Sequence, residues 1–291
     1  MTVPVVMMHG GSGNNPYYRD QRYLAFVLKQ AQQYNERVIL LGDSTHDYLP
    51  VERYNYADFY DEARKFFEKE YVQYSYYKKN HDRFTMAVFF MLKGFMQATG
   101  LKVIANTDSD MMTYCNMTEE ERKLPKNYLL ACCIPEYQPP FRWNASTETS
   151  FFTLEGICEV CEFIHRVYTT PAWLAKIKTK WDWHVANSPR GGVCDLTLLW
   201  LFVQDRNRER IVNLTPVIQS AENGTFSHKI SGDENSIQGE YRMDGGLKEI
   251  EWRGNQPYGY NLRLESWVRF KNIHLQGAQK RLASSFYRDA E

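Results

Sequence analysis

The chain of 291 residues carries 35 Lys and Arg against 35 Asp and Glu, so its formal net charge is zero. This balance excludes a global field that would attract nucleic acid or an anionic membrane, and any phosphate must be held by a local site. Because no stretch approaches the ~20 apolar residues that span a bilayer and the first residues lack a signal-peptide pattern, we expect a cytosolic protein without a transmembrane segment.

The first half of the chain alternates strand and helix patterns. Short apolar runs predict strands, and apolar residues at i, i+3 and i+4 spacing predict the helices between them. Such alternation is typical of parallel βαβ units with right-handed crossovers. The predicted elements are a strand over 3–8, a helix over 23–34, a strand over 37–41, helices over 58–74 and 81–99, and a strand over 102–106.

Polar segments follow three of these predicted strands. Residues 9–13 form a glycine-rich loop, Asp43 follows the second strand, and the acidic segment 108–110 follows the third. In open α/β sheets, ligands bind beyond the carboxyl ends of the strands. We therefore expect the three segments to lie at one edge of the sheet and to build the site.

The last third of the chain changes character. Alternating polar and apolar stretches predict antiparallel strands, and Asp244-Gly245-Gly246 is typical of a hairpin turn. No repeat or linker divides the chain, which predicts a single α/β domain over 1–291 with a mixed sheet. The elements expected here are helices over 153–165 and 181–201, with a loop at 188–192, and strands over 239–243, 247–252 and 267–270.

A polar, aromatic segment precedes the helix predicted at 153–165. It contains Trp143, Asn144, Ser146 and Thr149. Tryptophan and tyrosine combine an apolar face with a hydrogen-bonding tip, which suits the C–H face and hydroxyl rim of a sugar. We interpret the segment as a loop that could form a sugar-binding edge.

Asp108 and Asp110 are the first candidate metal ligands. Two carboxylates two residues apart, directly after a buried strand, can face one divalent cation if the backbone turns there. Hard oxygen ligands suit Mn²⁺ or Mg²⁺, which complete their coordination with substrate phosphates. A D-x-D segment alone is also common in solvated acidic loops, so this motif needs a second observation.

Residues 274–280 supply that observation, because they read H-x-x-G-x-x-K. The imidazole of His274 can be a third ligand for a borderline ion such as Mn²⁺. Gly277 permits close approach of the backbone to a diphosphate, and Lys280 supplies a point charge for its oxygens. A D-x-D after a mid-chain strand followed by this motif near the end is difficult to obtain by chance.

Together the two motifs resemble those of the GT-A-fold glycosyltransferases, especially the family 8 galactosyltransferase and glycogenin group. The resemblance implies a Rossmann-like central mixed sheet flanked by helices, with a small antiparallel C-terminal sheet. It also implies Mn²⁺ or Mg²⁺ as the cofactor, a UDP-sugar as the donor and an oligosaccharide or glycan as the acceptor. On this reading residues 1–112 form a nucleotide-binding half, and residues 113–291 form an acceptor half that carries the C-terminal motif.

The same resemblance assigns roles to individual residues. Asp108, Asp110 and His274 would bind the metal, while Gly277 and Lys280 would hold the diphosphate. The remaining expected contacts are His9, Gly10 and Gly11 around the nucleotide, Asp43 at the base or ribose, Ser109 beside the nucleotide, and Arg83 near the donor phosphates.

Two departures from family 8 concern the reacting centre. Lys280 is followed by Arg281-Leu282 where that family has Pro-Trp, and Gly192-Val-Cys-Asp195-Leu-Thr is similar to a segment of capsule- and virus-encoded transferases. Asp195 is the candidate catalytic residue. It would act as a general base in an inverting enzyme, or bind donor-sugar hydroxyls and stabilise positive charge in a retaining one. Alternatively, it caps the apolar helical run that follows. Asp182 and His184 are the second candidate acid/base pair.

Other functions remain open at this point. Gly42-Asp43-Ser44 is similar to the nucleophile block of GDS-type esterases, but the late D-x-x-H that would activate the serine is missing. A carbohydrate-binding or inactive transferase-like module would keep the aromatic residues and lose the metal set. The intact D-x-D and H-x-x-G-x-x-K motifs favour the enzyme.

Overall fold

The computed structural model describes residues 2–10, 22–188, 190–205, 208–216, 224–226, 228–232, 237 and 239–289. Within these residues the centre of the protein is a seven-stranded sheet of order β3-β2-β1-β4-β7-β6-β8. The first four strands in this order run parallel, whereas β7 is antiparallel to both β4 and β6. The strands are β1 (Val5–Met8), β2 (Val38–Gly42), β3 (Glu52–Asn55), β4 (Val103–Asp108), β6 (Leu130–Cys133), β7 (Ser146–Thr153) and β8 (Ile211–Asn213).

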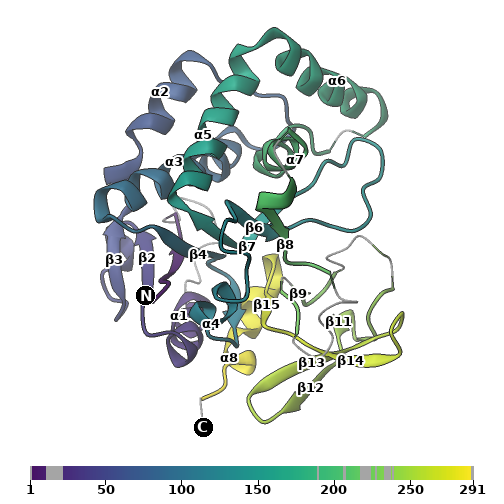
Figure 1. Cartoon of the computed structure of the whole chain (residues 1–291). Helices are drawn as coiled ribbons and strands as arrows, with labels where there is room; N and C mark the ends of the chain where they lie inside the picture. Colours follow the sequence, from purple (N-terminus) through teal and green to yellow (C-terminus); the bar gives the residue numbers. More distant parts are fainter. Residues whose placement is uncertain are drawn as a thin grey trace.

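Successive residues of the central strands face two different apolar cores, as the two-residue period of a strand requires. Val6 and Ile39 pack with α2, α3, α5 and α7, whereas Val5 and Val38 pack with α1 and the C-terminal strands. Figure 1 shows these two helix layers above and below the sheet. The helices are α1 (Arg22–Tyr34), α2 (Asp61–Lys69), α3 (Lys79–Thr99), α4 (Met117–Glu121), α5 (Leu154–Thr169), α6 (Pro171–Asn187), α7 (Asp195–Asp205) and α8 (Ala283–Phe286).

The C-terminal third forms small sheets beside the central one (Figure 1). In one of them β15 lies between β5 and β9, antiparallel to the first and parallel to the second. Strand β5 follows β4 almost directly, so this sheet returns the end of the chain to the carboxyl edge of the central sheet. The strands are β5 (Met111–Thr113), β9 (His228–Lys229), β10 (Met243–Asp244), β11 (Leu247–Lys248), β12 (Ile250–Arg253), β13 (Gln256–Asn261), β14 (Ser266–Arg269) and β15 (Asn272–His274).

The predicted fold class is confirmed: a central mixed sheet flanked by helices, with small antiparallel C-terminal sheets. Gly100 ends α3 with a φ of 72°, as a C-cap glycine does, and Asp244-Gly245-Gly246 turns between β10 and β11. Among the described residues, no helix combines the length and apolar character needed to cross a membrane.

Several predicted boundaries were wrong. The helix expected over 58–74 ends at Lys69, because the chain turns there and continues extended towards α3. The segment expected over 181–201, with its loop at 188–192, contains the end of α6 and the first part of α7, but α6 begins earlier than expected, at Pro171. The segment interpreted as a polar loop before 153 is largely β7, which begins at Ser146 and lies inside the central sheet.

Gly156 lies within helix α5 and provides a test of how closely this helix packs against the chain at Leu129. A Cβ atom there would lie 2.1 Å from the carbonyl oxygen of Leu129, although alanine normally stabilises a helix relative to glycine. We expect Gly156→Ala to lower the free energy of unfolding by about 1–3 kcal/mol because of overpacking, measured by chemical denaturation. Cys158→Ala, on the same helix at a half-buried position, should stay close to wild type. A Gly156→Ala protein more stable than wild type would contradict the packing of α5 against β6.

Candidate functional site

Strand pairing brings the D-x-D segment and the C-terminal motif together. Strands β4 and β7 pair up to Thr107 and Thr149, so Asp108 and Glu148 follow as neighbours across the two strands. On the other side, β15 pairs with β5 and sets His274 opposite Met111. The sheet edge thus receives side chains from β4, β7 and β15.

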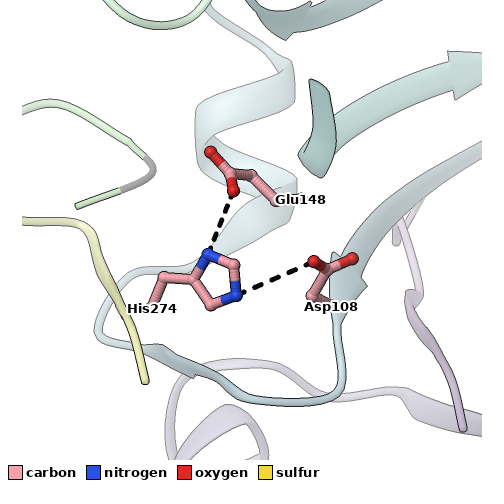
Figure 2. A group of neighbouring side chains, drawn as sticks. All are labelled: Asp108, Glu148 and His274. Atoms are coloured by element: carbon pink, nitrogen blue, oxygen red, sulfur yellow. Dashed lines mark hydrogen bonds and ion pairs between the residues drawn. The ribbon is translucent and has the colours of Figure 1, made fainter. Parts of the chain in front are cut away.

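The imidazole of His274 lies between acidic side chains. Its Nε2 is 2.9 Å from Asp110 Oδ1 and 3.8 Å from Asp108 Oδ2, and its Nδ1 is 3.0 Å from Glu148 Oε2. Figure 2 shows the ring between Glu148 on one side and Asp108 on the other. Lys280 Nζ lies 3.1 Å from Asp110 Oδ2, so both basic residues of the C-terminal motif contact the D-x-D segment.

Burial and charge set the protonation of this cluster. Burial acts to lower the pKa of His274, but the carboxylates of Asp110 and Glu148 raise it well above its usual value. For Asp110 burial acts in the opposite direction to His274 and Lys280, and these two cations lower its pKa below the usual range. The Asp108 side chain remains 48% exposed, so it is the acidic group of the cluster most open to a ligand from solvent.

The donor atoms suit a divalent cation. His274 Nε2 lies 2.9 Å from an oxygen of Asp110 and 3.8 Å from an oxygen of Asp108, and one ligand atom each from Asp108, Glu148 and His274 lie within 4.8 Å of one another. Two ligands on opposite sides of a Mg²⁺ ion stand about 4.2 Å apart, so small side-chain adjustments would suffice. Carboxylate oxygens with one imidazole nitrogen are a set that Mn²⁺ accepts. The residues present therefore fit a hard or borderline divalent ion.

The expected nucleotide edge adjoins this cluster. His9, directly after β1, has its Nδ1 2.9 Å from Ser109 Oγ and 3.4 Å from the Tyr23 hydroxyl. Burial, with His46 and Lys280 nearby, lowers the pKa of His9 to about 4, so its ring is neutral at pH 7. Gly10 packs against Phe84, whose ring lies 2.9 Å from where a Cβ atom would stand. Gly11 lies outside the described residues.

Asp43 and Arg83 make contacts within the protein that the ligand-binding roles expected for them did not include. Asp43 Oδ1 accepts a hydrogen bond from the Thr45 backbone N–H at 3.0 Å and caps the short 3-10 helix Ser44–His46. The guanidinium of Arg83 lies over the rings of Phe67 and Tyr71, at 5.4 and 5.8 Å from their centroids. Both side chains are therefore held by the protein itself in this structure.

Asp195 is the first residue of α7, where its carboxylate interacts with the Thr85 side chain and the Leu196 backbone. Burial raises its pKa, and burial is also the main cause that raises the pKa of Asp108, to which the charge of Asp195 adds a smaller part. The preceding Gly192 has a φ of 122°, and a Cβ there would lie 2.4 Å from the Tyr74 carbonyl oxygen. Glycine is thus required for the close approach that positions Asp195.

The second acid/base pair is not assembled. Asp182 is exposed on α6, whereas His184 lies against Gly191, at 3.2 Å from where a Cβ atom of that glycine would stand. The two side chains meet different surroundings, which disfavours a joint role in proton transfer.

Glu148 is the cluster residue that sequence reasoning missed. It stands between two threonines in Ser146–Thr153, a segment whose polar residues resembled a loop. The available signal was the series of β-branched and aromatic residues at 147, 149, 151 and 152, which favours a strand. Lys229, whose Nζ is 4.0 Å from Glu148 Oε2, was missed as well, because β9 has only two residues.

No protein-family model matches the chain, and no curated protein matches it. Mouse xyloside xylosyltransferase 1 is similar in structure, with 12% identity and a TM-score of 0.49 over 74% of this chain and 86% of its own. The galactosyltransferase LgtC, solved with donor and acceptor sugar analogues, has 11% identity and a TM-score of 0.40 over 73% of each chain. A glycosyltransferase involved in glycosylation of the major capsid of PBCV-1 has 9% identity and a TM-score of 0.42 over 98% of each chain. All three are glycosyltransferases, and at these identities the similarity describes the chain trace alone.

The loop before β7 is fastened by a buried lysine. Lys180 of α6 is only 2% exposed, and its ammonium donates to the carbonyl oxygens of Phe141 and Arg142 at 2.6 and 2.7 Å. Phe141 and Trp143 have φ values of 58° and 43°, a region that bulky residues rarely adopt. The Trp143 ring stacks on Trp200, with 5.3 Å between centroids. The lysine therefore stabilises a strained aromatic loop.

Replacement of this lysine should release the loop. We expect Lys180→Met to lower the free energy of unfolding by about 1–3 kcal/mol, because the carbonyl oxygens of Phe141 and Arg142 lose their charged donor. Chemical denaturation followed by tryptophan fluorescence would measure the change. Lys178→Met, at an exposed position on the same helix, is the matched control and should have little effect. Equal stability of the two variants would argue against stabilisation of the loop by Lys180.

Proposed function

We propose that this protein is a divalent-metal-dependent glycosyltransferase that moves a sugar from a UDP-sugar donor to an oligosaccharide or glycan acceptor. The observation that supports it most is the meeting of His274 with both acidic residues of the D-x-D segment, at 2.9 Å from Asp110 and 3.8 Å from Asp108. These residues are far apart in the sequence, and a pairing of motifs that arose by chance would not bring them together. The choice of UDP rests on the resemblance of the motifs alone.

In this proposal Asp108, Asp110 and His274 hold the cation, which when bound neutralises charge on the diphosphate leaving group. Lys280 adds a positive charge beside it, since its ammonium already lies next to Asp110. Gly277 has a φ of 56°, and no atom of the described residues lies within 4 Å of where its Cβ would stand, so a phosphate could approach its backbone. His9, Gly10 and Ser109 line the adjoining edge at the carboxyl ends of β1 and β4, where the nucleotide would lie.

Asp195 is the proposed reacting carboxylate. It is the first residue of α7, and burial raises its pKa. In an inverting reaction it would take the proton from the acceptor hydroxyl that attacks the anomeric carbon. In a retaining reaction it would hold donor-sugar hydroxyls and stabilise positive charge at that carbon. Either role requires the carboxylate to lie on the sugar side of the diphosphate.

The esterase alternative has less support. His46 Nδ1 lies 3.1 Å from Asp43 Oδ1, which resembles part of a catalytic triad. However, its Nε2 is buried and has no hydrogen-bond partner among the described residues, while Ser44 is exposed to solvent. A serine nucleophile requires a base within hydrogen-bonding distance, and this one does not reach Ser44.

Ligand-induced stabilisation would test the metal and donor together. UDP with Mn²⁺ should raise the melting temperature of the wild-type protein, since binding to the folded state alone adds about 2.7 kcal/mol at a ligand concentration of 100 Kd. UDP without the metal should have little effect. Asp110→Ala should abolish both the shift and the slow hydrolysis of UDP-sugars, because the carboxylate that contacts His274 and Lys280 is lost. Ser44→Ala should leave both near normal, and the reverse pattern would favour the esterase.

The role of Asp195 can be separated from binding. Asp195→Asn keeps the size of the side chain and removes its basicity, so hydrolysis of the UDP-sugar should fall by about 10²–10⁴-fold. The UDP-and-Mn²⁺ shift in melting temperature should remain as in wild type. Steady-state assays and thermal unfolding of the same preparations would measure the two. A loss of the thermal shift with unchanged turnover per bound donor would place Asp195 in binding instead.

A further inference from the structure

Glu148 is in an unusual position for a glutamate. It is the single charged residue of β7, it is 7% exposed, and it lies within the central sheet. A buried carboxylate is costly unless it is paired and hydrogen-bonded. Its partners are His274, with Nδ1 3.0 Å from Oε2, and Lys229, with Nζ 4.0 Å from the same oxygen. The strand therefore keeps a buried charge whose main contact is the candidate metal ligand.

We infer that Glu148 is a positioning residue, which accepts the Nδ1–H of His274 and so directs the Nε2 lone pair towards a cation at Asp108 and Asp110. This inference rests on the proposed function, because it concerns the same metal site. A histidine ligand commonly donates its other ring N–H to a carboxylate, which fixes both the tautomer and the orientation of the ring. Glu148 belongs to neither the D-x-D motif nor the H-x-x-G-x-x-K motif.

The geometry separates the two nitrogens of the ring. Nδ1 is directed at Glu148, whereas Nε2 is directed at Asp108 on the opposite side of the imidazole (Figure 2). The same Nε2 lies 2.9 Å from Asp110 Oδ1. A cation shared by the D-x-D aspartates would therefore meet Nε2. Glu148 would then contact the ligand His274 and not the metal itself, and Lys229 is the second positively charged neighbour of Glu148.

The backbone on both sides of this contact is fixed. Asn272, two residues before His274, donates from its side chain to Thr149 Oγ1 at 2.5 Å, which ties β15 to β7 next to Glu148. His274 is itself 4% exposed and is held in the ladder between β5 and β9. Because neither strand can shift easily, the carboxylate can impose one ring orientation.

The test compares Glu148→Gln, Glu148→Ala and Thr147→Val. Glutamine keeps an oxygen that can accept from Nδ1–H, alanine removes it, and Thr147 is the neighbouring residue on the same strand, directed to the opposite face. Mn²⁺ affinity of the nucleotide-free protein, measured by electron paramagnetic resonance, should fall by about 10–100-fold in Glu148→Ala and less in Glu148→Gln. Thr147→Val should bind as wild type.

A second measurement reports directly whether Nδ1 of the His274 ring keeps its proton. In protein loaded with Co²⁺, ligation through Nε2 leaves Nδ1–H as a solvent-exchangeable, paramagnetically shifted proton resonance. We expect this resonance in wild type and Glu148→Gln, and its loss through rapid exchange in Glu148→Ala. Thermal unfolding of the metal-free variants would establish that each is folded, and Glu148→Gln keeps the test informative if the alanine variant is not.

The outcomes distinguish this inference from the function on which it rests. Wild-type Mn²⁺ affinity in Glu148→Ala would overturn the positioning role and leave the metal site intact. Equal losses in the glutamine and alanine variants with a persistent Nδ1–H resonance would make Glu148 a metal ligand instead, which also overturns it. No Mn²⁺ binding by the wild-type protein would overturn the metal-dependent function and the inference with it.

Discussion

The pairing of β15 with β5 is the constraint on which the site depends. It sets His274 opposite Met111 and joins the Leu275 N–H to the Asp110 carbonyl oxygen at 2.9 Å. A shift by one residue would turn His274 to the other face of its strand, away from the aspartates. The hydrogen bond from Asn272 to Thr149 fixes this register from a second strand. The geometry of the cluster is therefore a property of the strand ladder as much as of the side chains.

That constraint explains how three carboxylates can lie together. Asp108, Asp110 and Glu148 would repel one another if left without positive partners. His274, Lys280 and Lys229 are brought to them by the C-terminal third of the chain, and each lies within 4.0 Å of at least one carboxylate. Positively charged residues from late segments of the chain thus balance the negative charge at the carboxyl edge of the central sheet. A divalent cation would replace part of this positive charge.

The sequence predicted the parts of the fold that have strong local signals. Strands β1 and β2 are continuous apolar runs and β4 begins with one, because apolar cores cover both faces of the sheet, and Gly100 ends α3 in a conformation that favours glycine. The convergence of Asp108, Asp110, His274 and Lys280 was also predicted, from the ligand chemistry of the two motifs and from the family resemblance that they carry. Strands such as β5, β9 and β15 were not, because elements of two or three residues have no periodicity to detect. Their positions are set by tertiary pairing.

The failure at β7 has a different cause, which concerns the site itself. A strand inside the sheet is expected to be apolar, yet Thr149 and Ser150 are fully buried and Glu148 is nearly so. Each of these polar groups has a partner within the structure: Ser150 Oγ donates to the Thr147 carbonyl oxygen at 3.3 Å, Thr149 accepts from Asn272, and Glu148 meets His274. Proteins depart from local sequence rules mainly where function requires it. The polar character that made β7 resemble a loop is therefore the same feature that holds the histidine of the candidate metal site.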